Sequence, residues 1–284
     1  MDIVAIFASA LMALVAPAGV VLDSLAADSL RRQVAEVDNL YVRIDNVPNF
    51  RLVNGRIDRA RVAARGVYPR QLPNLRIAAI DLETDPVAVD VGALQRGELK
   101  LNAPAQAALR LRLEDNDINA FLASPQVQTW LDTLRFNLPG DIGEREQRRY
   151  GLANPSLTFL ANNRLRLVLD LEDRVLAETI PITLETGIGV INGHRLELIQ
   201  PQLEIDGELA PPELVTSLTE GASQEFSLRR LEAWGLTSRI LAFTVRDSEL
   251  DLAVFARLEP DSPLLQQPTV PPPQTAGEAV PPTP

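Results

Sequence analysis

Apolar and polar residues alternate with a period of two along most of the chain, a pattern that predicts β-strands with one buried face. The clearest run lies at residues 105–113, where leucines and alanines alternate with Gln106, Arg110 and Arg112. Similar runs occupy residues 41–45, 59–65, 165–171, 180–186 and 239–258. Asn192-Gly193 is the strongest hairpin signal in the chain. We therefore expect one antiparallel sheet of many half-buried strands.

The apolar spacing becomes helical in a few segments, most extensively at residues 23–37, which predict an amphipathic helix. Shorter helices are expected near residues 91–94, 115–122, 125–134 and 211–218. Residues 66–73 and 137–154 are expected to be loops, and a change of phase near residues 78–79 predicts a β-bulge. The class is α+β, with a curved or barrel-like sheet.

Both ends of the chain differ from its centre. Residues 3–22 carry no charge and are about long enough to cross a bilayer or to form the apolar region of a signal peptide, cleaved after Ala18. We expect export or membrane association, although Asp2 and the absence of Lys or Arg before Arg31 are unusual for a signal peptide, and the alternative is a buried N-terminal helix of the fold. After Glu259, Pro, Gln and Thr dominate and predict a disordered tail. We divide the chain into an apolar segment (1–22), one domain (23–259) and a tail (260–284).

Composition excludes several classes of function. The chain has no cysteine and one histidine, His194, which rules out disulfides, thiolate metal sites and cysteine nucleophiles. Aromatic residues make up 5% of the chain and its net charge is −11, which together argue against nucleic-acid binding. His194 lies at a hairpin tip, where we expect solvent rather than a catalytic cleft. We expect no enzymatic activity, cofactor or metal, although a hydrolase that uses two carboxylates stays open.

Basic residues are concentrated early in the chain, with ten arginines and four acids between Arg31 and Arg76. Alternation places Arg59, Arg61 and Arg65 on one face of a strand. Together with Arg56, they are candidates for contacts with anionic headgroups, because the guanidinium fork suits phosphate. The alternative is an ordinary solvent face whose arginines pair with acids on a neighbouring strand.

Four short segments resemble, in order and spacing, the bacterial LmeA-like phospholipid-binding family. They are GRIDRARVAARG at residues 55–66, DVGALQRG at 90–97, DINAFL at 117–122 and VRDSEL at 245–250. The resemblance covers about residues 22–258. It implies a tubular lipid-binding fold, in which a highly curved antiparallel sheet wraps an N-terminal amphipathic helix and an apolar groove or tunnel holds acyl chains. We know of no catalytic residues in the family to carry over.

On this basis we predict a non-enzymatic protein that binds, or binds and transfers, phospholipid at a membrane or in the cell envelope. Each methylene removed from water contributes about 0.8 kcal/mol, so a continuous aliphatic lining would suffice to hold acyl chains. The alternative is a scaffold or adaptor with a solid core, whose Pro-rich tail binds a protein partner. The candidate lining residues are Val42, Ile44, Val62, Leu75, Ile77, Leu109, Leu111, Leu113, Leu167, Leu169, Ile182, Leu184, Leu196, Leu198, Leu252 and Val254.

Overall fold

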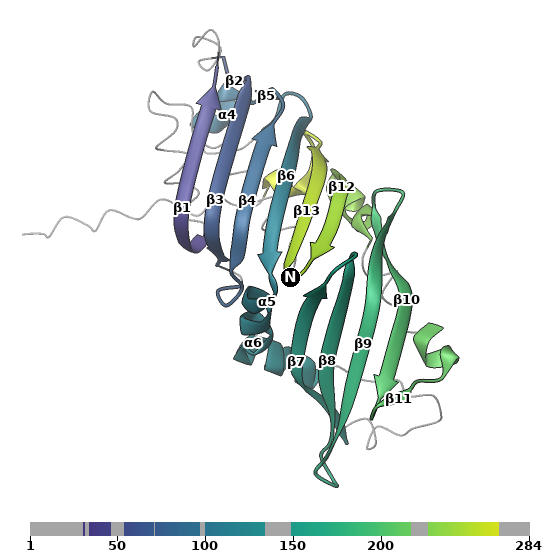
Figure 1. The fold of residues 1–284 in the computed structure, drawn as a ribbon. Coiled ribbons are helices and arrows are strands. Elements are labelled where there is room, and N and C mark those ends of the chain that lie inside the picture. Colours follow the sequence, from purple (N-terminus) through teal and green to yellow (C-terminus); the bar gives the residue numbers. More distant parts are fainter. Residues whose placement is uncertain are drawn as a thin grey trace, which may run out of the picture.

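The computed structural model describes residue 31 and residues 34–46, 54–70, 72–96, 100–133, 149–216 and 227–266. They form two large antiparallel sheets that lie side by side (Figure 1). The six-stranded sheet has the order β1 (Val34–Asp45), β3 (Arg59–Pro69), β4 (Ile77–Thr84), β6 (Ala105–Glu114), β13 (Glu249–Leu258) and β12 (Leu236–Arg246). The five-stranded sheet has the order β11 (Glu208–Leu209), β10 (Arg195–Ile205), β9 (Glu178–Ile191), β8 (Arg164–Asp173) and β7 (Tyr150–Leu160).

A two-stranded sheet, β2 (Arg56–Ile57) with β5 (Val87–Ala88), and a few short helices complete the described part. The helices are α4 (Val91–Gln95), α5 (Asp115–Leu122), α6 (Pro125–Thr133) and the 3-10 helices η1 (Leu228–Trp234) and η2 (Pro263–Gln266). The α+β class is confirmed. The expectation of a single sheet is wrong, and the described strands do not close into a barrel. The expected apolar segment and most of the expected N-terminal helix lie outside the described residues.

The core of the protein lies against one face of the six-stranded sheet. Directly opposed residues of antiparallel strands share a face, and Val42, Val62, Leu82, Leu109 and Val254 form one such row across five strands. Each of these side chains is at most 7% exposed. A fully buried aliphatic side chain contributes about 1.5–3 kcal/mol, so this row is a main source of stability.

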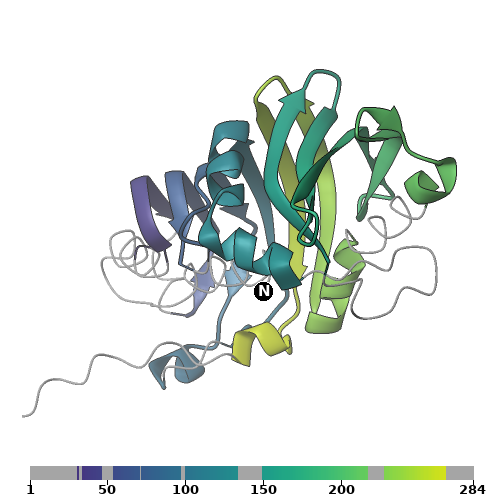
Figure 2. The same ribbon diagram turned by 90° about the horizontal axis from the view of Figure 1, so that it is seen from below.

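The helices α4, η1 and η2 lie on one side of the six-stranded sheet (Figures 1 and 2). Leu264 and Leu265 of η2 are buried in the same cluster as the row of five, and Leu231 of η1 packs against it. Ser262 is 1% exposed, and its hydroxyl donates to the carbonyl oxygen of Trp234 at 2.5 Å. The folded part therefore extends to at least Gln266, beyond the boundary expected at residue 259.

Two elements in the first half differ from the expected ones. β1 begins at Val34, inside the segment 23–37 expected to be helical, and β3 runs to Pro69 through the expected loop at 66–73. The pairing of β4 with β3 and with β6 has no register shift, so the prediction of a β-bulge at residues 78–79 is wrong. Gly66, with φ of +59°, lies in β3 opposite this region. Ala64, Val67 and Ile77 form one buried cluster around it, which explains the mixed phase of the apolar residues.

The two sheets are joined along the outer edge of β12 by two turns of the five-stranded sheet. The side-chain oxygen of Asn163 accepts a hydrogen bond from the Val245 amide at 2.7 Å. The carbonyl oxygen of Gly193 accepts one from the Ile240 amide at 2.6 Å. Asn192 and Gly193 both have positive φ, and the His194 amide donates to the Ile191 carbonyl oxygen at 3.1 Å within the turn that joins Ile191 to Arg195. The expected hairpin is confirmed, but its tip lies against β12 and leaves His194 half-buried rather than solvated.

Helix α5 holds the outer edge of β7. The side-chain amide of Asn119 donates to the carbonyl oxygen of Leu157 at 2.8 Å and accepts from its N–H at 2.7 Å, so it acts as a partner for an edge strand. β7 begins at Tyr150, which shows that the expected loop at 137–154 ends earlier.

Candidate functional site

One face of the five-stranded sheet is almost wholly aliphatic. Across β8 and β9, Leu167 opposes Leu184 and Leu169 opposes Ile182. Leu203 of β10 also opposes Leu184, so the row continues across the sheet. On this face Phe159, Thr186 and Ile188 are buried and Val190 is exposed. The other opposed residues define what we call the open apolar face: Leu152, Leu157, Leu165, Leu167, Leu169, Leu171, Ile180, Ile182, Leu184, Leu196, Leu198, Leu203 and Ile205. All of its members are half-buried.

The exposure of the open apolar face does not come from the sheet edges. β8 and β9 are interior strands with a hydrogen-bonded neighbour on each side, yet Leu167, Leu169, Ile182 and Leu184 all stay half-buried. In a covered sheet, central aliphatic residues are buried, as in the row through Leu109. These side chains are therefore reached by solvent from above the face.

The open apolar face is continuous with the apolar face of the six-stranded sheet. At the junction, Phe159 of β7 is buried with Val245 and Leu250 in one cluster. Leu157 and Leu165 pack against this cluster from the open apolar face. Leu113, Phe243 and Leu252 of the six-stranded sheet pack against it as well, and all three are half-buried. The two apolar faces thus meet on the same side of the molecule.

A β-bulge in β10 keeps that strand on the open apolar face. The register against β9 shifts between Ile199 and Gln202, and Gln200 has φ of +47°. Because of this extra residue, Leu198 and Leu203 point to the same side although their numbers differ in parity. Ile199 lies on the other side, close to Gly187 and Gly189, where a Cβ at either glycine would meet its side chain.

The structure divides the candidate lining residues into three groups. Those packed in the core are Val42, Val62, Ile77, Leu109 and Val254. Those half-buried in or beside the six-stranded sheet are Ile44, Leu75, Leu111, Leu113 and Leu252. Those on the open apolar face are Leu167, Leu169, Ile182, Leu184, Leu196 and Leu198. Sequence reasoning omitted from the lining Leu152, Leu157, Leu165, Leu171, Ile180, Leu203 and Ile205, although the alternation at 165–171 already indicated two of them.

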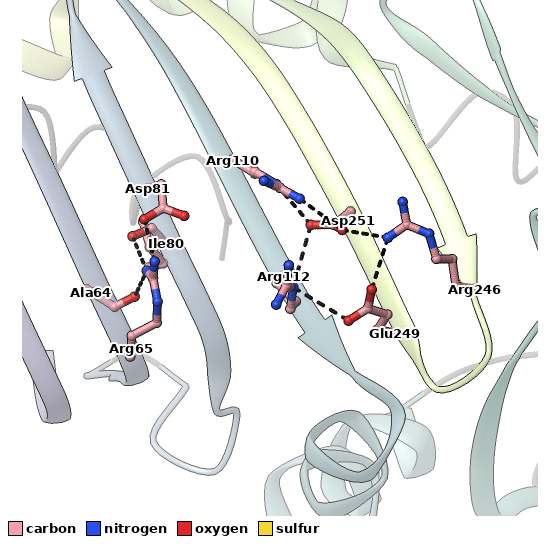
Figure 3. Close-up of polar contacts among 9 residues, drawn as sticks. All are labelled: Ala64, Arg65, Ile80, Asp81, Arg110, Arg112, Arg246, Glu249 and Asp251. Atoms are coloured by element: carbon pink, nitrogen blue, oxygen red, sulfur yellow. Dashed lines mark hydrogen bonds and ion pairs between the residues drawn. The ribbon is translucent and has the colours of Figure 1, made fainter.

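The candidate headgroup arginines lie elsewhere. Arg59, Arg61 and Arg65 are on the polar face of the six-stranded sheet, opposite its core. They form ion pairs with acids of neighbouring strands: Arg59 with Glu83 at 3.2 Å, Arg61 with Asp45 at 3.1 Å and Arg65 with Asp81 at 2.8 Å. Figure 3 shows the contacts of Arg65. Arg56 is exposed in β2. This is the paired solvent face of the alternative interpretation, and none of the four arginines belongs to the open apolar face.

The same polar face carries a second charged cluster around Asp251 (Figure 3). Arg110 binds its two carboxylate oxygens at 3.1 and 3.2 Å, and Arg246 approaches at 3.2 Å. Burial raises the pKa of Asp251, but the hydrogen bonds and charges of the arginines outweigh it and leave the pKa below its usual value. A general acid needs the opposite shift. Because Arg110 lies in β6, Arg246 in β12 and Asp251 in β13, the ion pairs link these three strands.

The described residues lack two kinds of feature. They hold no group of three or more His, Asp or Glu side chains able to bind a metal ion. Among them there is also no helix of the length and hydropathy needed to span a membrane.

Comparison with known families decides the relationship. The sequence model of the LmeA-like phospholipid-binding family matches residues 15–255, most of the chain. The chain belongs to this family. No match was found among curated proteins or among solved structures.

The segments that carry the LmeA-like resemblance have structural roles here. Gly66 supplies a positive φ, the Asp90 carboxylate accepts from the Ala93 amide at 2.9 Å and begins α4, and Asn119 holds β7. The hydrogen bond from Ala93 is the main reason why the pKa of Asp90 is lowered. These residues therefore stabilise turns and edges of the fold.

Proposed function

We propose that the protein binds the acyl chains of phospholipids on the open apolar face, without catalysing a reaction. The observation that carries the proposal is the half-burial of Leu167, Leu169, Ile182 and Leu184 in the interior strands of the sheet. Membership of a phospholipid-binding family supports the class of ligand. The half-buried residues of the six-stranded sheet would extend the binding surface across the junction.

The dimensions of the face suit an acyl chain. From Leu165 to Leu171, β8 rises by six residues along the open apolar face, which at about 3.3 Å per residue is about 20 Å. One leaflet of a bilayer core is about 15 Å thick, so an extended acyl chain fits along the strand. Removal of about ten methylenes from water contributes about 8 kcal/mol, which corresponds to roughly micromolar affinity before ordering costs.

In this proposal the arginines of β3 have no direct part in binding, because Glu83, Asp45 and Asp81 already pair with them. The headgroup would extend beyond the sheet into water. Binding of this kind is compatible with a carrier that transfers phospholipid at a membrane or in the cell envelope, and family membership fits an association with membranes.

The test is uptake of a fluorescent phospholipid by the purified protein, with native mass spectrometry to identify bound lipid. The double variant Leu167→Ser/Leu184→Ser should lower affinity by at least about tenfold, since two large aliphatic contacts are lost at the centre of the face. Val168→Ser is the matched control, because Val168 is equally half-buried in β8 but points to the opposite side. Absence of lipid from the wild type, or equal losses in both variants, would refute the proposal.

The same assay separates lipid binding from the scaffold alternative. A chain that ends at Gln266 keeps every strand of both sheets and the buried η2 helix. It should take up lipid as the full chain does. Loss of uptake in this truncated chain would contradict the assignment of binding to the sheet.

A further inference from the structure

The turn between β8 and β9 holds two aliphatic side chains in solvent at the far end of the five-stranded sheet (Figure 1). Val175 is 72% exposed and Leu176 is 57% exposed. Isolated exposed aliphatic residues are ordinary on protein surfaces. Val175 and Leu176, however, are adjacent at the tip of a hairpin, so together they form one exposed apolar surface. Polar residues could stand at both positions without any loss of packing.

The turn is held rigidly in this arrangement by Asp173, which is 4% exposed. One carboxylate oxygen of Asp173 accepts hydrogen bonds from the Val175 amide at 2.9 Å and the Leu176 amide at 3.1 Å. The other oxygen accepts from Arg149 Nε at 2.7 Å. The Ala177 amide donates to the Asp173 carbonyl oxygen at 2.8 Å. Both aliphatic residues are thus fixed outward by bonds to their own backbone.

The charged residue of the turn is directed away from the tip. Arg174 pairs with Asp132 of α6, and its guanidinium lies against Gly151 of β7. The arginine therefore lies back over the sheet, and Val175 and Leu176 are the residues left at the tip. The flanking acids Glu172 and Glu178 carry negative charge, so the tip has no excess of positive charge with which to attract an anionic surface.

The tip is continuous with the open apolar face. Leu171 and Ile180 form the opposed pair of that face nearest to the turn, and both are half-buried. Leu169 and Ile182 follow in the next row. An apolar path therefore leads from Val175 and Leu176 along β8 and β9 toward the junction of the two sheets.

We propose that the β8–β9 turn inserts Val175 and Leu176 into the apolar layer of a phospholipid bilayer, and that lipid enters the open apolar face from this end. The proposal rests on the proposed function and adds the place at which the protein meets the membrane. Two aliphatic side chains are too few for a stable protein interface, which buries about 1,000 Å² or more. They are sufficient for shallow insertion, since each gains free energy as soon as it leaves water. Without basic residues free at the tip, docking does not depend on anionic lipid.

The experiment compares two sources of the same ligand. Extraction of a fluorescent long-chain phosphatidylcholine from phosphatidylcholine vesicles requires docking and binding. Uptake of a short-chain phosphatidylcholine below its critical micelle concentration requires binding alone. For Val175→Ser/Leu176→Ser we expect vesicle extraction slower by about tenfold or more, with monomer uptake unchanged. Leu241→Ser is the matched control, because Leu241 is 62% exposed on β12 of the other sheet, and it should behave as the wild type does.

Each other outcome has a definite meaning. Vesicle extraction by the tip variant at the wild-type rate would overturn the docking proposal and leave the binding face intact. Failure of the wild type to take up monomeric lipid would overturn the proposed function itself. If light scattering showed that the tip variant changes the mass of the protein, the tip would be a contact between copies and the proposal would be wrong. Equal acceleration of both proteins by phosphatidylglycerol vesicles would assign docking to basic residues instead.

Discussion

Replacement of Asn163 tests whether a single side chain joins the two sheets. Asn163 lies in the β7–β8 turn with φ of +58°, and its side-chain oxygen accepts the Val245 amide at 2.7 Å. Val245 is 2% exposed, so water does not replace this acceptor when it is removed. We expect Asn163→Ala to weaken the contact between β12 and the five-stranded sheet.

The expected loss of stability has two parts. A buried amide left without an acceptor costs about 1–3 kcal/mol. Alanine in the left-handed region costs about 1 kcal/mol more than asparagine. The sum is about 2–4 kcal/mol in the free energy of unfolding. Asn162→Ala is the matched control, because Asn162 has φ of +62° in the same turn but is exposed, so it should lose only the conformational part. The difference between the two variants measures the hydrogen bond.

Urea unfolding followed by circular dichroism gives both free energies, and hydrogen exchange gives the protection of the Val245 amide. Asn163→Asp keeps the acceptor and should unfold close to the wild type. Equal stability of Asn163→Ala and Asn162→Ala, together with unchanged protection at Val245, would refute the view that this side chain holds the junction.

Two further predictions concern the turn at Asp173 and the positive φ of Gly66. The hydrogen bond from Arg149 lowers the pKa of Asp173 from 3.8 to about 2. The ionised Asp173 carboxylate therefore stabilises the fold fully above about pH 4, and this stabilisation is lost as the pH falls toward 2. The urea midpoints of the wild type and Asp173→Asn should converge over that interval, and a constant difference between them would contradict the prediction. Gly66→Ala places a Cβ with φ of +59° against the Asp38 carboxylate, whereas Gly207→Ala, with φ of +77°, meets open space. Gly207→Ala should cost about 1 kcal/mol and Gly66→Ala clearly more, which thermal unfolding of the two variants would show.

The arginine strand shows why charge pattern alone predicts a site poorly. Alternation correctly places Arg59, Arg61 and Arg65 on one face of β3. Whether such a face is free to bind an anion depends on the residues opposite, and Asp81 and Glu83 of β4 come from a separate part of the sequence. Exposed pairs of this kind contribute only about 0–1 kcal/mol each, but they occupy the guanidinium groups that a headgroup would need.

What the sequence by itself determined are the features set by neighbours along the chain. The alternation of apolar and polar residues placed most strands and their faces, Asn192-Gly193 placed a hairpin, and the lack of cysteine and the single histidine removed the usual reactive groups. The family segments together indicated the relationship that the family match then showed. These signals are local, because side-chain direction in a strand repeats every two residues whatever lies above the sheet.

Only the tertiary structure decided which aliphatic residues are covered. Leu109 and Leu167 have the same alternation and the same chemistry, yet Leu109 is buried by η2 and its neighbours while Leu167 stays half-buried. The division into two sheets and the bulge in β10 likewise depend on contacts between distant segments. The burial of a side chain depends on which other segments pack against its face of the sheet. The alternation of residues within one strand does not identify those segments.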